Sequence, residues 1–351
     1  MPTTIRDVAK QAGVDVGTVS RALRGQRHVS AECLRRVTEA VRILRYRPLR
    51  RRGPVATNPL TGRTVGVVLL GMHHSLAALP AVRTVIAAVE RELTTAGAEV
   101  LHLDVPDVHT VPAALRRDRL DGLVLKSAMQ GEVLSTTGEA INRLRGMPSV
   151  WATGRPIGGW GDAAGADDHG AGGLAAEHLA ARGHRHVALL NPKPDHVLFM
   201  RREDGFLSAA RRNGLTVAVH VPVAPVARRI WRLPLRPVVF TQEVVALLDA
   251  AMAARPRPTA VFVPADNIAV LVHKALIQRG LQPGRDVALV SCNHEPELTA
   301  DLDPSLTTID IRLDEIGRLA VELLARRLLV GPERATVDMT VGPRLVCGAT
   351  T

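Results

Sequence analysis

The chain has 351 residues, of which 46% are hydrophobic, and a formal net charge of +11. This length exceeds the roughly 250–300 residues at which a single hydrophobic core stops growing, so we expect more than one domain. No apolar run reaches the ~20 residues of a membrane span, and Arg6, Asp7, Lys10 and Asp15 interrupt the segment that a signal peptide would need to be apolar. We therefore expect a cytoplasmic protein with no membrane partner.

The residues typical of metal sites and catalysis are not grouped in recognisable motifs. Cys33, Cys292 and Cys347 show no C-x-x-C spacing, which argues against a disulfide framework and against a thiolate metal site. The sequence has no G-x-S-x-G, no H-E-x-x-H, no P-loop and no G-x-G-x-x-G after a strand. It therefore predicts no catalytic site, no metal and no cofactor, and we expect a protein that is not an enzyme.

The positive charge is concentrated at the N-terminus. Residues 1–63 carry a net charge of +10, and the other 288 residues carry +1. Lys and Arg release condensed counterions from phosphates, so a basic segment beside a near-neutral body is typical of a module that binds a polyanion. A solubilising arginine-rich segment is the alternative that charge alone leaves open.

Residues 1–48 show the pattern of three short helices. Thr4 is positioned to cap the first helix, Gly13 to end it, and Asp15 to cap a second helix after a tight turn. A third helix follows Ser30 and ends before Pro48. The apolar positions expected to face inward are Ile5, Val8, Ala9 and Ala12 in the first helix, Val19, Ala22 and Leu23 in the second, and Cys33, Leu34, Val37, Ala40, Val41 and Leu44 in the third.

The order of these residues matches a known family. Residues 4–14 (TIRDVAKQAGV), 18–23 (TVSRAL), 28–30 (HVS) and 46–48 (YRP) resemble the head of LacI/GalR-family repressors. The resemblance implies a helix-turn-helix DNA-binding domain at residues 1–48 whose second helix lies in the major groove.

The resemblance also implies which side chains contact DNA. Val16, Gly17, Thr18 and Arg21 would face bases, and backbone phosphates would lie near Ser20, Arg24 and His28, with Thr4 in the same DNA-binding set. Arg21 is the best candidate for a base contact, because its planar fork can bond O6 and N7 of guanine, and a phosphate contact is its alternative. Val16 and Gly17 replace the longer side chains usual in the family, so the operator sequence is not predicted.

Residues 49–63 form the expected basic linker. Arg50, Arg51 and Arg52 precede a stretch rich in proline and glycine that favours an open connector. In the family this place holds a hinge helix whose leucine inserts into the minor groove, and Leu60 is the nearest candidate here. Pro59 and the missing family arginine leave a flexible, phosphate-binding arm as an equal alternative.

Residues 64–345 change to short apolar strands that alternate with helices, the pattern of doubly wound parallel sheets. We expect strands near residues 65–70, 100–103, 122–125, 150, 187–190, 260–263 and 287–290, and helices near 82–96, 172–181 and 269–278. Runs at 177–179, 183–187, 202–206, 306–309 and 317–321 resemble the same family. They imply a periplasmic-binding-protein-like core of two lobes that the chain crosses between three times, with an N-lobe of about 64–163 and 309–329 and a C-lobe of about 164–308 and 330–345.

The resemblance places a small-molecule effector in the cleft between the lobes. Carried over residue by residue, it gives Asp168, His169, Arg202, Asp266 and Asn293 as effector-binding residues. Carboxylates and a guanidinium suit a polyhydroxylated, sugar-like ligand. Ala265 and the pair Asn293–His294 depart from the family pattern, so the pocket is altered.

Each of these residues also has an ordinary structural explanation. The two aspartates could cap the helices that follow them, and Arg202 could pair with Glu203 or Asp204 on a solvated face. Trp151, Trp160 and Phe199 are candidates to stack on a ligand ring, with core packing as the alternative.

The predicted protein is therefore a cytoplasmic, nucleoid-associated, sequence-specific transcriptional regulator. It is expected to act as a repressor whose homodimer binds a pseudo-palindromic operator in double-stranded DNA, under the control of a sugar-like effector. A solute-binding protein is the main alternative from another class, and the basic head argues against it.

Overall fold

The computed structural model describes residues 4–23, 29–44, 58–107, 109–116, 120–129, 138–222, 234–235, 240–331 and 334–351. It divides into two compact units, the head (Met1–Thr57) and the core (Asn58–Thr351). No helix among these residues is both long and apolar enough to span a membrane.

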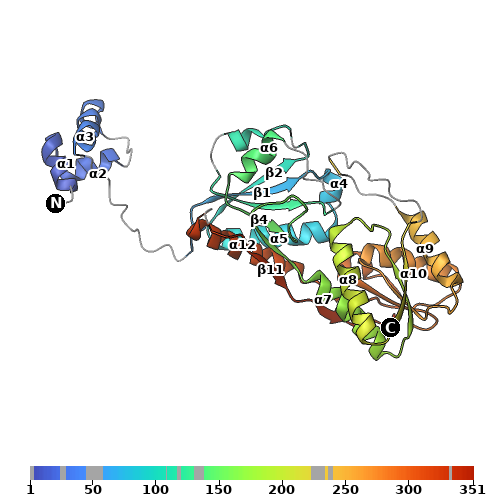
Figure 1. Ribbon diagram of the computed structural model, residues 1–351. Helices are drawn as coiled ribbons and strands as arrows, with labels where there is room; N and C mark the ends of the chain where they lie inside the picture. Colours follow the sequence, from blue (N-terminus) through green and yellow to red (C-terminus); the bar gives the residue numbers. More distant parts are fainter. Residues whose placement is uncertain are drawn as a thin grey trace. The chain divides into compact units, whose positions relative to one another are not determined.

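The head contains α1 (Ile5–Ala12), α2 (Val16–Leu23) and α3 (Ala31–Ile43), which confirms the three expected helices (Figure 1). Thr4 and Asp7 form a capping box at the start of α1, and Ser30 caps α3. Val8, Val19 and Val37 supply one buried residue from each helix, so the three helices share one small core.

Arg36 of α3 fixes the turn between α1 and α2. Its Nε donates to the Ala12 carbonyl at 3.0 Å and its Nη2 to the Gly13 carbonyl at 2.9 Å, so it satisfies carbonyls that the end of a helix leaves unpaired. Gly13 has a φ of +65°, and a Cβ there would lie 2.6 Å from Arg36 Nη2. One expectation for this unit was wrong: Leu34 is 45% exposed, because Val37 and Ala40 take the buried face of α3.

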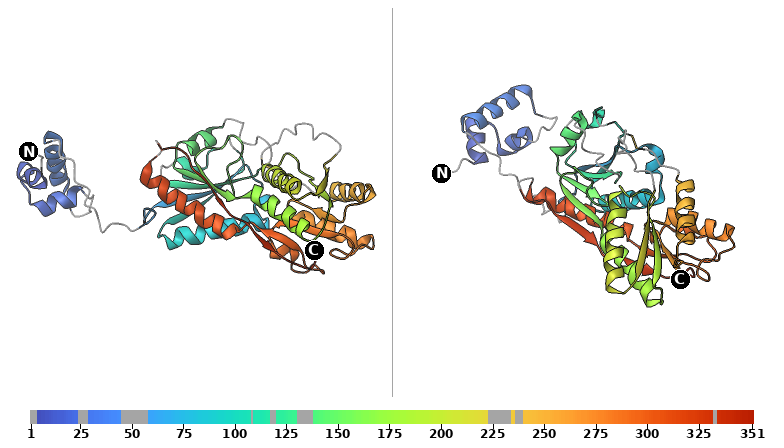
Figure 2. Two further views of the ribbon diagram at one scale, coloured as in Figure 1. Left: turned by 60° about the horizontal axis from the view of Figure 1, so that its bottom comes forward. Right: turned by 45° about the vertical axis from the view of Figure 1, so that its right-hand side comes forward.

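The core contains two six-stranded sheets, one in each lobe (Figures 1 and 2). The N-lobe sheet has the order β11-β5-β4-β3-β1-β2 and is parallel throughout. Its strands are β1 (Thr64–Leu70), β2 (Glu99–Val105), β3 (Gly122–Ser127), β4 (Ser149–Ala152), β5 (Asp162–Ala166) and β11 (Asp338–Val341).

The C-lobe sheet has the order β12-β10-β9-β8-β6-β7. Its strands are β6 (His186–Leu190), β7 (Thr216–His220), β8 (Ala260–Phe262), β9 (Ala288–Asn293), β10 (Thr307–Asp310) and β12 (Arg344–Val346). The edge strand β12 is antiparallel to β10, and the other pairs are parallel. The two-lobed, doubly wound architecture is thereby confirmed, with one antiparallel edge added to it.

Helices cover both faces of these sheets, which explains why the central strands are almost continuously apolar. In Figure 1, α6 lies on one face of the N-lobe sheet, and α5 and α12 lie on the other. The N-lobe helices are α4 (His74–Ala77), α5 (Pro80–Thr95), the 3-10 helix η1 (Ala113–Arg116), α6 (Glu139–Arg145) and α12 (Leu313–Val330). The C-lobe helices are α7 (Asp168–Ala181), α8 (Val197–Arg212), α9 (Thr241–Ala253), α10 (Asp266–Gln278) and α11 (Pro296–Thr299).

The chain crosses between the lobes after β5, after β10 and after β11. The last crossing differs from the sequence expectation, which assigned residues 330–345 to the C-lobe. Residues 338–341 pair instead with β5 of the N-lobe, in register from Asp338 opposite Ala163 to Val341 opposite Ala166. Only the strand that follows, β12, belongs to the C-lobe sheet.

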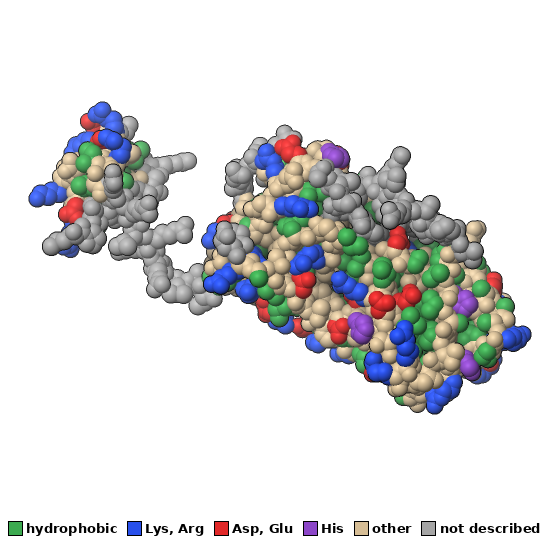
Figure 3. Space-filling model, viewed as in Figure 1, with side chains coloured by type: hydrophobic (Ala, Val, Ile, Leu, Met, Phe, Trp, Pro, Cys, Tyr) green, Lys and Arg blue, Asp and Glu red, His purple; other side chains and the backbone are tan. Residues whose placement is uncertain are grey.

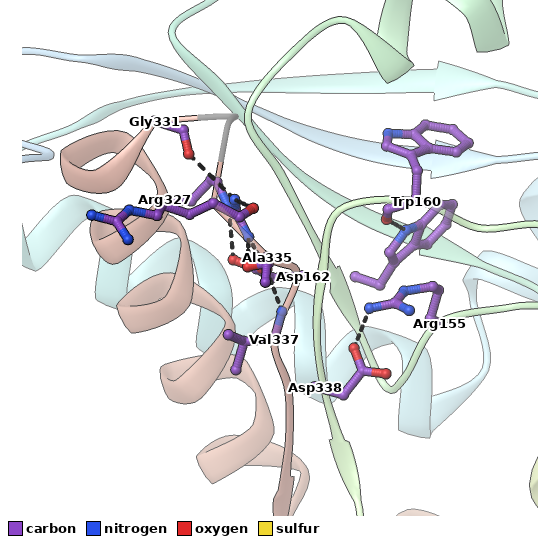
Figure 4. Close-up of polar contacts among 10 residues, drawn as sticks. Arg155, Trp160, Asp162, Arg327, Gly331, Ala335, Val337 and Asp338 are labelled. Carbon is purple, nitrogen blue, oxygen red and sulfur yellow. Dashed lines mark hydrogen bonds and ion pairs between the residues drawn. The ribbon is translucent and has the colours of Figure 1, made fainter.

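A buried ion pair fastens this return of the chain (Figure 4). The Arg327 guanidinium, near the end of α12, donates from Nε to Asp162 Oδ2 at 2.9 Å and from Nη2 to the Ala335 carbonyl at 3.0 Å. Asp162 Oδ1 also accepts from the Val337 amide at 2.7 Å. The start of β5 therefore holds both the end of α12 and the approach to β11.

The segment expected to be a free linker is partly docked on the core. The Thr61 hydroxyl donates to the Ala96 carbonyl at 3.0 Å, and the Gly62 amide donates to the Gly97 carbonyl at 2.8 Å. Leu60 is only 1% exposed and belongs to the main core cluster. The hypothesis that Leu60 inserts into the minor groove is wrong for this structure, because burying its side chain in the core removes it from solvent.

The two helices α7 and α8 touch through their backbones. A Cβ on Gly172 would lie 1.9 Å from the Arg202 carbonyl oxygen, and a Cβ on Gly205 would lie 1.9 Å from the His169 carbonyl oxygen. Only glycine permits this approach at both places. The contact brings Asp168, at the start of α7, beside Arg202 of α8.

Replacing Gly172 by alanine should destabilise the core. Because the new methyl group would overlap main-chain atoms, we expect a loss of about 1–3 kcal/mol or more in the free energy of unfolding by urea. The matched control is Gly173→Ala, whose Cβ would meet its nearest atom, Ala209 Cβ, at 3.9 Å. This control should leave stability unchanged or raise it by up to ~1 kcal/mol. Equal stabilities of the two variants would contradict the close approach.

Candidate effector cleft and DNA-binding face

A cavity of about 160 Å³ lies between the lobes, at the carboxyl ends of their strands. Residues at or just beyond the ends of β1, β3, β4, β6, β8, β9 and β10 line it. Ligands of open α/β sheets bind at this end, since the loops that leave the strands diverge there. The topology alone therefore fixes where the site lies.

Arg202 joins its own helix α8 to three other segments of the C-lobe on one side of this cavity. Its side chain is buried, with 1% of the residue exposed. Nε donates to Asp168 Oδ1 at 2.8 Å, and Nη1 donates to the Pro264 carbonyl at 2.6 Å and to Asn293 Oδ1 at 2.8 Å. Burial raises the pKa of the Asp168 carboxyl, and the charge of Arg202 opposes that rise. The guanidinium thus fixes the start of α7, the loop after β8 and the end of β9.

Asn293 links Arg202 to Glu295 through hydrogen bonds of its side-chain amide. Asn293 Nδ2 donates to Glu295 Oε2 at 2.7 Å, and the Glu295 amide donates to Asp266 Oδ2 at 2.7 Å. Burial raises the pKa values of both carboxyls, Glu295 and Asp266. Asn293 and His294 have φ values of +118° and +60°, a conformation that non-glycine residues seldom adopt. Such backbone strain is common at binding sites.

Hydrogen bonds donated by backbone amides connect the two lobes at the cleft. The Ala81 amide, at the start of α5, donates to Glu295 Oε1 at 3.0 Å. The Val197 amide donates to the Met129 carbonyl at 2.8 Å. Leu235 bonds in both directions, donating to the Gly71 carbonyl and accepting from the His73 amide, each at 2.8 Å. These bonds hold the lobes together around the cavity.

Three basic side chains line the cavity. Lys126 is 7% exposed, and its Nζ donates to the Ser127 carbonyl at 2.6 Å. Lys193 Nζ lies 4.5 Å from the centre of the Phe240 ring. Burial lowers the pKa of each lysine to about 8. Burial, together with the nearby cations, holds the pKa of His196 well below its ordinary value, so this imidazole is neutral at pH 7.

The structure brings together only part of the effector-binding set predicted from the sequence. Arg202 and Asn293 line the cavity. Asp168 lies behind Arg202 as its ion-pair partner. Asp266 is fully buried outside the cavity lining, and its oxygens accept from the Thr308 hydroxyl at 2.7 Å, from Ser291 and from the Glu295 amide. His169 is exposed and is not among the described residues that line the cavity, so its assignment as an effector contact stays a prediction.

Sequence reasoning missed Lys126, Lys193, His196 and Glu295. Lys126 lies inside β3, and Lys193 and Glu295 lie two or three residues beyond the ends of β6 and β9, so a charged residue at the end of an apolar strand was the available signal for these three. His196 lies further along the loop after β6 and gave no such signal. Among the aromatic candidates for ring stacking, Phe199 lines the cavity. Trp151 is buried in the N-lobe core, in an edge-to-face contact with Trp160.

The described part of the head presents one face of α2 away from its core. Val19 and Ala22 are buried against the other helices, and Val16 and Gly17 are exposed. The Asp15 carboxylate accepts hydrogen bonds from the Thr18 amide at 2.8 Å and from the Thr18 hydroxyl at 2.5 Å, and these bonds fix the first turn of α2. Ser20 is half-buried and Thr4 caps α1. The side chain of Arg21, and all of Arg24 and His28, lie outside the described residues. Basic side chains are visible on the described surface of the head (Figure 3).

A three-helix head of this kind and a two-lobed core with an internal cleft define the class of ligand-binding transcriptional regulators. Residues 4–48 match the model described as "Bacterial regulatory proteins, lacI family", and residues 176–351 match "Periplasmic binding protein-like domain". The chain belongs to the lacI family of bacterial regulatory proteins.

Individual relatives cover almost the whole chain. The ribose operon repressor of Escherichia coli (strain K12) is 26% identical over 338 residues, which is 93% of each protein. The HTH-type transcriptional repressor PurR of Aliivibrio fischeri (strain ATCC 700601 / ES114) is 28% identical over 93% of this chain and 91% of its own. Both names describe repressors.

Solved structures share the fold. A complex of the transcriptional regulator CelR with cellobiose has a TM-score of 0.63 at 22% identity, covering 99% of this chain and 100% of that one. The lac repressor dimer bound to operator and the anti-inducer ONPF has a TM-score of 0.62 at 22% identity, covering 100% of this chain and 99% of that one.

Replacing Glu295 by alanine should loosen the cleft. The Ala81 amide then loses its carboxylate acceptor across the lobes, and we expect its hydrogen exchange to become about tenfold faster. Amide exchange followed by mass spectrometry on peptides that contain the start of α5 measures this. The control is Glu297→Ala, an exposed carboxylate on α11. Equal acceleration in both variants would contradict the role of Glu295 in joining the lobes.

Proposed function

We propose that this chain is a transcriptional repressor whose homodimer binds a pseudo-palindromic operator, under the control of a small molecule held between the core lobes. The observation that carries the proposal is the combination of two features in separate compact units: a head whose second helix exposes Val16 and Gly17 on the side away from its core, and a core with a cavity between its two lobes. The first is suited to enter a major groove, and the second to sense a ligand.

The direction of control and the ligand class rest on the relatives. The ribose operon repressor and PurR support repression, and the lac repressor dimer on its operator supports a two-fold assembly. A complex with cellobiose, and a lacI-family regulator from Enterococcus faecium with bound ribose (TM-score 0.62, 21% identity, 82% of this chain), support a sugar-like effector. We propose the same for this chain, acting in the cytoplasm on nucleoid DNA.

A solute-binding protein and an enzyme are the competing classes. The basic head has no role in either. Among the described residues no three side chains of His, Cys, Asp or Glu are arranged to hold a metal ion. The relatives named above are DNA-binding repressors, which supports regulation over catalysis.

Arg21 is the residue to test in the head. An operator is first selected from random duplexes with the full chain, and binding is then measured at fixed salt concentration. If Arg21 bonds a guanine edge, Arg21→Ala should weaken binding by about 1–3 kcal/mol and relax base preference at one position in each half-site.

The control for this experiment is Arg42→Ala. Arg42 lies on α3, where its Nε donates to Glu39 at 3.0 Å, and its replacement should change operator affinity little. A loss that is uniform over all DNA sequences would identify Arg21 as a phosphate contact. If no duplex were bound above bulk DNA, the proposed function itself would fail.

A further inference from the structure

The cleft has an unusual distribution of lysine. The whole chain has only four lysines among its 45 lysines and arginines, namely Lys10, Lys126, Lys193 and Lys274. Two of the four, Lys126 and Lys193, line the cavity between the lobes described above. An ammonium is a compact point charge on a flexible stem, whereas the arginines that dominate this chain carry a broad planar fork. The compact ammonium group of lysine suits the small volume of this cavity better than the broader guanidinium of arginine would.

The charges that face the cavity do not balance. Arg202 is neutralised from behind by Asp168, at 2.8 Å. Glu295 is the carboxylate that lines the cavity among the described residues, and its two oxygens already accept from the Ala81 amide and from Asn293. No carboxylate of a described residue lies within the 4.0 Å of an ion pair from Nζ of Lys126 or Lys193. Asp195 does not line the cavity, and its charge acts on Lys193 from beyond ion-pair distance. Among the described residues that line the cavity, two ammonium groups therefore face one carboxylate that is already engaged.

The hydrogen-bonding capacity of these groups is also incompletely used. An ammonium has three N–H donors, and Lys126 uses one of them on the Ser127 carbonyl. Lys193 faces the Phe240 ring. The buried Nδ1 of His196 has no partner among the described residues. Burying a charged or polar group without a partner is costly, so a bound anion that accepts from these donors would recover much of that cost.

Most of the remaining cavity wall is apolar, and Thr153 and Asn267 are its other polar residues in the described part of the chain. Met72, Val82, Met129, Phe199 and Leu313 line it, from both lobes. Its volume, about 160 Å³, is near that of a cavity of roughly 150 Å³ that holds benzene. The site is thus small, with a basic cluster set in an apolar wall.

We propose that the effector of this cleft is a small organic anion, whose carboxylate or phosphate group is bound by Lys126, Lys193 and His196 and whose body packs on the apolar wall. This inference rests on the proposed function, since it specifies the ligand of the same cleft. It adds that the ligand carries negative charge, which a neutral sugar does not.

Matched ligand pairs test the charge. Calorimetric titration of the full chain compares benzoate with benzamide, and ribose 5-phosphate with ribose, so that each pair differs mainly in its negative group. We expect the anion to bind at least about tenfold more tightly than its neutral partner in one pair or both. The pair that shows the preference distinguishes a carboxylate from a phosphate. Equal affinity within both pairs, or no binding of either anion, would overturn the proposal.

Lysine variants test the site. Lys126→Met and Lys193→Met should each weaken anion binding by about tenfold to a hundredfold, and Lys274→Met, exposed on α10, should not. Without ligand, the melting temperature of the two cleft variants should stay the same or rise, because methionine removes a partly desolvated charge that has no ion-pair partner within 4.0 Å among the described residues. Unchanged anion binding in both cleft variants, or a fall in their ligand-free melting temperatures, would overturn the proposal.

Operator binding separates this inference from the proposed function. If ribose alone binds and changes operator affinity, the effector is neutral and only the anion inference fails. If an anion binds through the two lysines and leaves operator affinity unchanged, the anion inference holds and ligand control of DNA binding fails.

Discussion

The arrangement of the effector cleft depends on the hydrogen bonds and the ion pair made by the Arg202 guanidinium. The ion pair exists in its observed form because Gly172 and Gly205 let α7 and α8 touch through their backbones, which places Asp168 within 2.8 Å of Arg202 Nε. The same guanidinium fixes Asn293, and Asn293 orients Glu295. The absence of a Cβ at Gly172 and Gly205 thus helps to determine the position of the Glu295 carboxylate, which accepts from the Ala81 amide of the other lobe.

The topology of the two sheets places this local arrangement at the cavity between the lobes. Both sheets direct the carboxyl ends of their strands at one cavity, so residues from seven strands converge there without any long loop. The bonds from Glu295 to Ala81 and from Val197 to Met129 cross between the lobes at its rim. A ligand that bound between these contacts would shift a conformational equilibrium of the lobes only if its affinity differed between the two conformations.

Much of the fold was predictable because its signals are local. Thr4 and Ser30 mark helix starts because their side chains accept from backbone amides three residues on, and Gly13 marks a helix end through its positive φ. The strands are apolar runs whose faces are covered by helices. Contacts between distant segments were not predictable. The burial of Leu60 requires the linker to dock beside the end of α5, and β11 joins the N-lobe through a pairing that its own residues do not specify. Lys126 and His196 line the same cavity only because the two sheets face each other.

The most direct test of this account is a double-mutant cycle on the ion pair, with Asp168→Leu, Arg202→Met and the double variant compared by urea unfolding of the full chain. Each single change leaves one charge buried without its partner, so each should cost about 3–5 kcal/mol. The double variant should cost clearly less than the sum of the two, by about 1 kcal/mol or more. Losses that add to within ~0.5 kcal/mol would show that Asp168 and Arg202 act independently, which would contradict the account.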